Sequence, residues 1–312
     1  MVESLGIIEK GESMYHCAII GAGAIGGWLA GHIGLQNSVC FVDSRQTVPS
    51  QLALSVTSLI KGTIQLDVPV LTQIPGCHWL IICVKAHQVR PAIQHLKFPK
   101  DCQVLLMVNG LGAHTPLLSR VDTGHLCLAS NTHGVLLQQK TAGQLSVKHT
   151  GLGRIDIGSV IRSQAAPEHF NSIQNAIAPL LWQDNIYQAL WLKLAVNCCI
   201  NPLTAIHNCT NGELLQTRYR QQIGALNQEL SQVAQAEGIN LSSQTLTDTV
   251  LMVASNTAHN YSSMQQDIKH HRPSEIDYIN GYVVRLAEIH QLPCQHHKAL
   301  LEQIKLLESH HG

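Results

Sequence analysis

Residues 17–26 read CAIIGAGAIG, an apolar run followed by glycines in the pattern G-x-G-x-x-G. The apolar run predicts a buried β-strand, and the residues after the glycines are typical of a helix. In such a unit Gly21 permits the tight turn, Gly23 lets a pyrophosphate approach the backbone, and Gly26 lets helix and strand pack closely. The pyrophosphate would lie at the positive N-terminus of the helix. We therefore expect a dinucleotide site formed by Gly21, Gly23, Ala24, Ile25 and Gly26.

The first half of the chain repeats this alternation of strand and helix. Further continuous apolar runs occupy residues 39–43, 79–85, 104–110 and 125–130. Continuous apolarity is typical of parallel strands that are buried on both faces. Strand–helix alternation predicts an α/β fold, a Rossmann-type doubly wound domain. Residues 144–160 alternate more and contain a glycine-rich turn, so we expect a hairpin that finishes the sheet.

The pattern changes near residue 182. Strand-like runs stop, and apolar residues recur at spacings of three and four, which is the helix period. We therefore predict a dinucleotide-binding domain over residues 1–184, with residues 1–14 as an extension. An all-helical domain over residues 185–312 would carry the substrate and the catalytic groups.

Composition excludes several classes of protein. Of the 312 residues, 45% are hydrophobic and 13% charged, which is typical of a globular chain. Lys+Arg and Asp+Glu both number 20 and no basic run occurs, so we expect neither nucleic acid nor a membrane as partner. No apolar run reaches the roughly 18–20 residues of a membrane span, and the N-terminus does not read as a signal peptide.

The cysteines and histidines favour no metal. Cys17, Cys40, Cys83 and Cys127 lie in apolar runs, where a free thiol behaves as a small hydrophobic group. No C-x-x-C pair occurs, so we predict a reducing, cytoplasmic location. We expect the histidine doublets to be solvated surface and not metal ligands; they lie at 270–271, 296–297 and 310–311.

Charged and amide residues end several predicted strands. Asp43 closes the second run, where an acid binds the ribose hydroxyls of NAD, and Arg45 follows, where an arginine accommodates the 2′-phosphate of NADP. The pattern leaves both cofactors open, and Arg45 could equally be a solvated loop charge. Lys85 and Asn109 close the third and fourth runs and would face the cofactor crevice. The NGLG turn at 109–112 would let the backbone pass close to a ligand.

Residues 193–205, KLAVNCCINPLTA, carry a polar ridge on an apolar helix. Lys193, Asn197 and Asn201 lie four residues apart and share one face over about 12 Å. The ridge could be the solvent face of an amphipathic helix, but its neighbours are apolar and predict burial. Buried polar groups need partners, so the ridge is a candidate site lining. We expect Pro202 to bend or break the helix and turn Asn201 into the cleft.

These motifs, in their order, resemble the ketopantoate reductase family. The resemblance covers most of the chain and rests on residues 21–27, 83–88, 109–112, 149–158, 191–205, 262–268 and 272–284. It implies a Rossmann-type domain followed by a helical domain similar to that of 6-phosphogluconate dehydrogenases, with the substrate between them. It further implies that NADPH reduces the C2 ketone of 2-dehydropantoate to pantoate, in the pathway to pantothenate and coenzyme A.

The resemblance also assigns roles by position. Lys193 would be the general acid and Glu275 the acid that orients it, although Glu275 could instead be a first-turn acid of a helix. Ser274 reads first as a helix cap. The remaining assignments place Asn109, Asn197, Asn201 and Ser263 at the substrate, Asn109 also at the nicotinamide, and Lys85 and Gln88 near the cofactor.

Some positions depart from the family pattern. Val108 and Ser274 replace its commoner Gln and Thr, and Arg45 lies one place beyond the expected arginine. Residues 290–297 differ at Gln291, Gln295 and His297, which we expect to reshape one wall of the cleft. A reductase of another 2-keto acid, using NADPH or NADH, therefore stays open, as does a non-catalytic dinucleotide sensor. A monomer and a homodimer are both compatible with the sequence.

Overall fold

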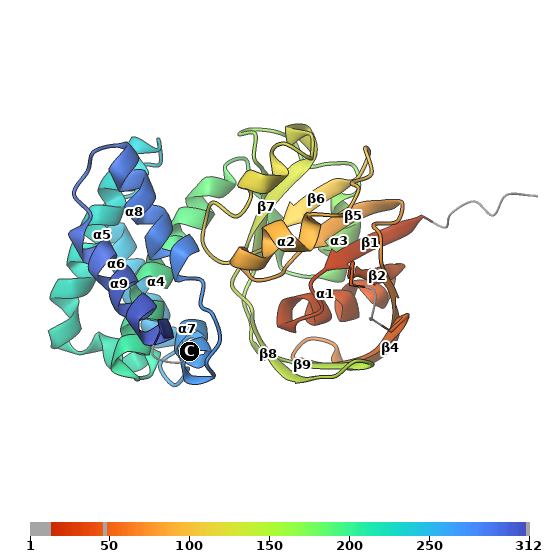
Figure 1. The fold of residues 1–312 in the computed structure, drawn as a ribbon, viewed down its shortest axis with the longest axis horizontal. Helices are drawn as coiled ribbons and strands as arrows, with labels where there is room; N and C mark the ends of the chain where they lie inside the picture. The colour runs from red at the N-terminus through yellow and green to blue at the C-terminus, as the bar shows by residue number, and fades with distance from the viewer. Residues whose placement is uncertain (1–13, 46–48, 310–312) are drawn as a thin grey trace, which may run out of the picture.

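The computed structural model describes residues 14–45 and 49–309. Apart from Met14, the expected N-terminal extension lies outside the described residues, as does the histidine doublet at 310–311. The chain forms a sheet-containing domain followed by a helical domain, and α4 (Ile186–His207) runs from one into the other (Figure 1). This arrangement confirms the predicted fold class.

The central sheet is parallel, as the apolar runs predict. Five strands lie in the order β7-β6-β5-β1-β2. Successive residues of β1 enter opposite cores: Cys17 and Ile19 pack on one side of the sheet, Ala18 and Ile20 on the other. The strands and the helices and turns that join them span β1 (Tyr15–Ile20), α1 (Ala24–Gly34), β2 (Val39–Val42), β5 (Cys77–Ile82), η1 (Ala86–Gln88), α2 (Val89–Ile93), β6 (Gln103–Leu106), η2 (Thr115–Leu117), η3 (Thr123–His125) and β7 (Leu126–Asn131).

The predicted hairpin over residues 144–160 is wrong. β9 (Gln144–Gly151) pairs with β8 (Gly134–Lys140), whereas β10 (Ile155–Ser159) pairs antiparallel with β7, far from β9 in the sheet. In the glycine-rich turn between them, the backbone at Gly153 passes against the backbone at Thr132. A Cβ on Gly153 would lie 2.4 Å from the carbonyl carbon of Thr132. Beyond β10, α3 (Phe170–Ala176) leads to the last strand, β11 (Leu180–Trp182).

The far end of the sheet curls around α1, which the apolar pattern of the sequence does not predict. β4 (Gly62–Leu71), β3 (Gln51–Ser58), β9 and β8 continue the sheet beyond β2, and α1 lies between them and the central strands (Figure 1). The close approach depends on glycines, because a Cβ on Gly31 would lie 2.5 Å from Val56. β3, β4 and β9 bury roughly alternate residues and β8 is largely exposed, so their runs are not continuously apolar.

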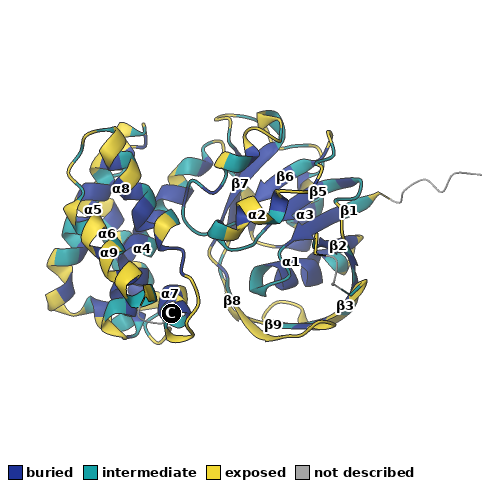
Figure 2. Ribbon diagram, viewed as in Figure 1, coloured by how far each residue is buried: buried dark blue, intermediate teal, exposed yellow. Residues whose placement is uncertain are grey.

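The second domain is all helical, as predicted. Besides α4 it contains η4 (Asn211–Leu215), α5 (Thr217–Ala236), α6 (Ser243–Asn256), α7 (Ser263–Lys269), η5 (Ile276–Tyr278), α8 (Asn280–Ile289) and α9 (Gln295–Ser309). α4 packs against α5, α6, α7 and α9, and buried residues follow it and the central strands (Figure 2). By length and composition α4 could cross a membrane, but 67% of its most apolar stretch is buried inside this chain. It is therefore the core helix of the domain.

The break expected at Pro202 does not occur, because α4 continues to His207. A proline cannot donate to the carbonyl four residues earlier. Here Nδ2 of Asn280 donates to that carbonyl of Cys198 at 3.1 Å, and Asn280 is fully buried. The same amide group lies 3.1 Å from Nδ1 of His297. A side chain of α8 thus replaces the missing backbone donor and ties α4 to α9.

The histidine at position 297 corrects two expectations. Its side chain is fully buried, with Nε2 donating to the carbonyl of Leu226 at 3.0 Å, so the 296–297 doublet is not solvated surface. Glu229 of α5 accepts from the backbone and ring of His296. Residues 290–297 therefore pack on α5, on the side of the helical domain away from the sheet, and do not form a wall of the cleft (Figure 1).

Candidate active site

The glycine-rich loop has the geometry that a dinucleotide needs. Gly21 has a φ of +119°, and a Cβ there would lie 3.0 Å from the backbone at Cys83. A Cβ on Gly26 would lie 1.9 Å from the carbonyl oxygen of Gly21, whereas a Cβ on Gly23 would meet nothing within 4 Å. Gly21 and Gly26 thus fix the turn, and Gly23 leaves open space beside the start of α1. No side chain caps that helix, so its first amide groups at Ala24 and Ile25 fit a pyrophosphate.

The end of β2 carries an ion pair. The guanidinium of Arg45 donates to both carboxylate oxygens of Asp43, with Nε at 2.9 and 3.1 Å. These hydrogen bonds, opposed by burial, lower the pKa of Asp43. Asp43 and Arg45 therefore form one charged unit beside the place that a dinucleotide's ribose would take.

Glu275 joins the two domains. Its Oε1 accepts the backbone N–H of Ala86 at 2.9 Å, and its Oε2 accepts Nδ2 of Asn109 at 3.0 Å. Ala86 and Asn109 follow β5 and β6, so the carboxylate of the helical domain lies at the carboxyl edge of the parallel sheet. Glu275 is 6% exposed and makes no cap hydrogen bond to η5, which disfavours the first-turn alternative. Ser274 does accept the N–H of Ile276 at 3.2 Å, as a capping residue does.

Lys193 reaches the same edge from α4. Its ammonium donates to the backbone carbonyl of Asn131, at the end of β7, at 2.8 Å. Burial lowers the pKa of Lys193 to about 8, and the negative charge of Glu275 opposes this shift. A lysine with this pKa is still mostly protonated at neutral pH and gives up its proton more readily than a solvated lysine.

The α4 ridge carries two amides besides Lys193. Nδ2 of Asn197 is buried and has no hydrogen-bond partner within the described residues. Asn201 is 7% exposed, and its backbone carbonyl accepts the hydroxyl of Thr204 at 3.2 Å. The hydroxyls of Thr204 and Ser262 lie 2.7 Å apart, which ties the start of α7 to α4. Ser263 follows at the first position of α7 and is exposed. The orientation of Asn201 into the cleft stays a prediction.

Lys85 is held by a residue that the sequence analysis did not single out. Its ammonium pairs with Asp267 of α7, whose other carboxylate oxygen accepts Nε of Arg272 at 3.1 Å. Asp267 is 4% exposed, so two cations neutralise a buried carboxylate. Gln88 accepts the backbone N–H of Lys85 at 3.3 Å and thereby fixes the turn after β5. No local pattern around Asp267 predicts this contact, because the two partners lie 182 residues apart.

The NGLG turn docks on the helical domain, and its close approach to a ligand stays a prediction. Gly110 has a φ of +77°, and a Cβ there would lie 2.1 Å from the carbonyl oxygen of Tyr278. The N–H of Leu111 donates to the same oxygen at 2.8 Å. The glycines therefore let the end of β6 dock on the helical domain, while Asn109 in the same turn bonds Glu275.

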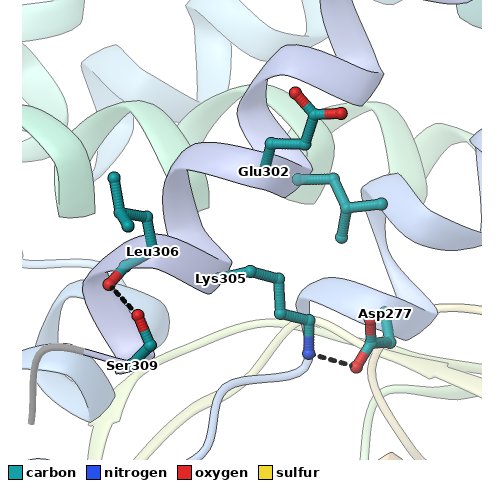
Figure 3. A pocket seen from close by; sticks show the side chains of 6 residues that line it. Asp277, Glu302, Lys305, Leu306 and Ser309 are labelled. Atoms are coloured by element: carbon teal, nitrogen blue, oxygen red, sulfur yellow. Dashed lines mark hydrogen bonds and ion pairs between the residues drawn. The ribbon is translucent and has the colours of Figure 1, made fainter.

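A surface hollow elsewhere in the helical domain contains none of these groups. It has a volume of about 510 Å³ and lies along α9, lined by Asp277, Leu301, Glu302, Lys305, Leu306 and Ser309. An ion pair between Lys305 and Asp277 closes one side of it (Figure 3). Glu275 and Asn109 instead bond each other between the two domains, and Lys193 reaches the end of β7 at the same carboxyl edge of the sheet.

Comparisons with known proteins agree with this arrangement. Residues 17–161 match the family described as Ketopantoate reductase PanE/ApbA, and residues 185–308 match its C-terminal domain. The chain is 38% identical over 301 residues to the 2-dehydropantoate 2-reductase of Vibrio cholerae, covering 93% of this chain and 97% of that protein. It is 30% identical over 298 residues to the Bacillus subtilis enzyme of the same name, covering 93% and 96%.

Solved structures share the fold over nearly the whole chain. A PanE/ApbA family ketopantoate reductase from Ralstonia eutropha is 26% identical with a TM-score of 0.79, covering 95% of this chain and 99% of that one. D-mandelate dehydrogenase with NADH and anilino(oxo)acetate is 23% identical with a TM-score of 0.82, at the same coverage, which is a likeness of fold. Both parts of this chain match one family, and close relatives span its length. The chain therefore belongs to the ketopantoate reductase family, a family of dinucleotide-dependent oxidoreductases acting on CH–OH groups.

Proposed function

We propose that this chain reduces 2-dehydropantoate to pantoate with NADPH, using Lys193 as general acid and Glu275 to orient it. Membership of the family supports the reaction. The main observation behind the proposed site is that Glu275 bonds Ala86 and Asn109 across the domains, and that its charge acts on the pKa of Lys193. This bridge lies where ligands bind in open α/β sheets, which supports the proposal that Lys193 and Glu275 act as a pair.

The cofactor fits the residues present. Gly21, Gly23 and Gly26 and the start of α1 would hold its pyrophosphate, and Arg45 would lie near its adenosine ribose. Lys85, Gln88 and Asn109 lie on the turns after β5 and β6 and would face the nicotinamide. When bound, the nicotinamide supplies a hydride to the carbonyl carbon of the substrate. We propose NADPH over NADH because an arginine follows Asp43, and Asp43 is already paired with it.

The protein's own groups would complete the reduction. As the carbonyl carbon gains a hydride, its oxygen becomes an alkoxide and takes a proton from the ammonium of Lys193, so that C=O becomes CH–OH. The ammonium also stabilises the negative charge as it develops. The negative charge of Glu275 keeps Lys193 protonated for this step. The unpartnered amide of Asn197, with Asn201 and the hydroxyl of Ser263, would bind the polar groups of the keto acid.

The biological setting follows from the reaction. Pantoate is a precursor of pantothenate and coenzyme A, so we place the enzyme in that pathway and in the cytoplasm. Its partner is a small keto acid, and a monomer and a homodimer are both compatible with the proposal.

A turnover assay tests the proposal. Purified enzyme with 2-dehydropantoate should oxidise NADPH faster than NADH, and Lys193→Ala should lower kcat by about 10²-fold or more. Lys148→Ala, an exposed lysine on β9, is the matched control and should leave the rate unchanged. Equal rates for wild type and Lys193→Ala would refute the role of the lysine. Equal or better turnover of pyruvate-sized acids would favour another substrate, and NADPH binding without turnover would favour a sensor.

A further inference from the structure

The curled end of the sheet delivers a lysine to the glycine-rich loop. Lys140 is the last residue of β8, and its ammonium donates to the backbone carbonyl of Ala22 at 2.5 Å. Lys140 pairs with Leu145 across the hairpin. Leu145 packs on α1 where Gly27 leaves room, since a Cβ on Gly27 would lie 3.0 Å from it. The hairpin is thus anchored on the first turn of α1, with Lys140 held over the loop.

The positive charges of Lys140 and Arg45 repel each other. Burial of its ammonium against the loop lowers the pKa of Lys140, and the positive charge of Arg45 lowers it further, while Asp43 opposes both. Asp43 is engaged by the guanidinium of Arg45 in a two-oxygen contact. Lys140 has no ion-pair partner within the described residues. The group therefore has one positive charge in excess, and an anion between the two cations would relieve their repulsion.

The position of this group indicates which anion it fits. In a dinucleotide-binding fold the adenosine ribose lies at the end of the second strand, and a 2′-phosphate there needs cationic donors. Asp43 would bind the free ribose hydroxyls of an unphosphorylated dinucleotide, but Arg45 already occupies it. We propose that Lys140 is a second cation for the 2′-phosphate, and that it helps the enzyme to select a 2′-phosphorylated dinucleotide. This inference rests on the proposed preference for NADPH.

Binding of two small probes tests it without turnover. Adenosine 2′,5′-bisphosphate carries the 2′-phosphate, and adenosine 5′-monophosphate lacks it. We expect Lys140→Gln to weaken binding of the bisphosphate about tenfold, because one charge-assisted contact is lost, and to leave the monophosphate within about twofold. Lys140→Arg should retain most of the affinity. Lys148→Gln, on the neighbouring strand of the same hairpin, should change neither.

The outcomes separate this inference from the proposed function. If the wild type prefers the bisphosphate and Lys140→Gln loses that preference, the role of Lys140 stands. If the wild type prefers the bisphosphate and Lys140→Gln keeps the preference, Lys140 is not a specificity residue, and the proposed use of NADPH is unaffected. If the wild type binds both probes equally, the proposed cofactor and the role of Lys140 fail together. Calorimetric titration measures all affinities, and thermal unfolding shows that the variants fold.

Discussion

Glu275 of the helical domain bonds two residues of the dinucleotide-binding domain, and its charge affects the pKa of Lys193. The carboxylate raises the pKa of Lys193 against the effect of burial. Glu275→Gln removes that charge and turns an amide donor toward one of two N–H groups, from Ala86 and Asn109. We expect the pKa of Lys193 to fall below about 8 in the variant.

The pH dependence of kcat measures this shift. A general acid must be protonated, so activity is present below the pKa of Lys193 and is lost as pH rises through it. In Glu275→Gln the midpoint of this loss should move to lower pH, together with a lower maximum rate. Glu302→Gln, an exposed acid on α9, should leave the midpoint in place. A midpoint that is the same in Glu275→Gln and wild type would show that the carboxylate does not act on the lysine.

The glycines of the loop divide into two kinds, which gives a second prediction at the residue scale. A Cβ on Gly26 would collide with the carbonyl of Gly21 at 1.9 Å, so Gly26→Ala should lower the melting temperature of the free protein. A Cβ on Gly23 would meet nothing within 4 Å, so Gly23→Ala should fold normally. It should nevertheless weaken dinucleotide binding by about tenfold or more, because the methyl group takes space that the pyrophosphate needs. Equal affinity for NADPH in Gly23→Ala and wild type would place the pyrophosphate elsewhere.

At the scale of elements, α4 depends on a neighbouring helix at its proline. Asn280→Ala leaves the buried carbonyl of Cys198 without a donor, which should cost about 1–3 kcal/mol in the free energy of unfolding. Pro202→Ala restores a backbone N–H at the right place. Asn280→Ala should therefore cost less in the Pro202→Ala background, and urea unfolding of the four proteins gives the difference. Equal costs in both backgrounds would mean that Asn280 acts only through His297.

The helices and strands differ in how well a single sequence predicts them. The continuous apolar runs of β1, β5, β6 and β7 and the three–four spacing of α4, α5 and α9 identified those elements correctly. The sequence did not predict β3, β4 and β8. Only one face of β3 and of β4 is buried, and β8 is largely exposed at the edge of the sheet. The break predicted at Pro202 was wrong, because Asn280, which bonds the carbonyl that proline leaves without a donor, lies 82 residues along the chain from Cys198.

The candidate site was predictable only in part for the same reason. The glycine pattern and the ridge from Lys193 to Asn201 are local and could be recognised directly. Glu275 needed the family resemblance, because its partner Ala86 lies 189 residues away. Lys140 and Asp267 had no local signal. Lys140 reaches Ala22 only when the hairpin packs on α1, and Asp267 reaches Lys85 only when α7 docks on the other domain.

At the scale of the whole molecule, two buried histidines predict sensitivity to acid. Burial lowers the pKa of His133 to about 4, with His149 contributing next, and burial also lowers the pKa of His297 to about 4. One lies in the interior of the sheet domain and the other in the core of the helical domain. In the unfolded chain both titrate near their ordinary value of 6.5. Between pH 6.5 and about 4 the unfolded state therefore binds more protons than the native state.

Stability should fall as pH decreases through this window and stop falling, for these groups, below about pH 4. Each histidine accounts for about 3 kcal/mol across the window, which is a large share of the stability of a typical domain. Urea unfolding at several pH values between 4 and 7 measures the slope. His297→Asn removes one titrating group and should flatten it, whereas His259→Asn, an exposed histidine, should not. An unchanged slope in His297→Asn would mean that the pKa of His297 in the native state is not lowered from its ordinary value.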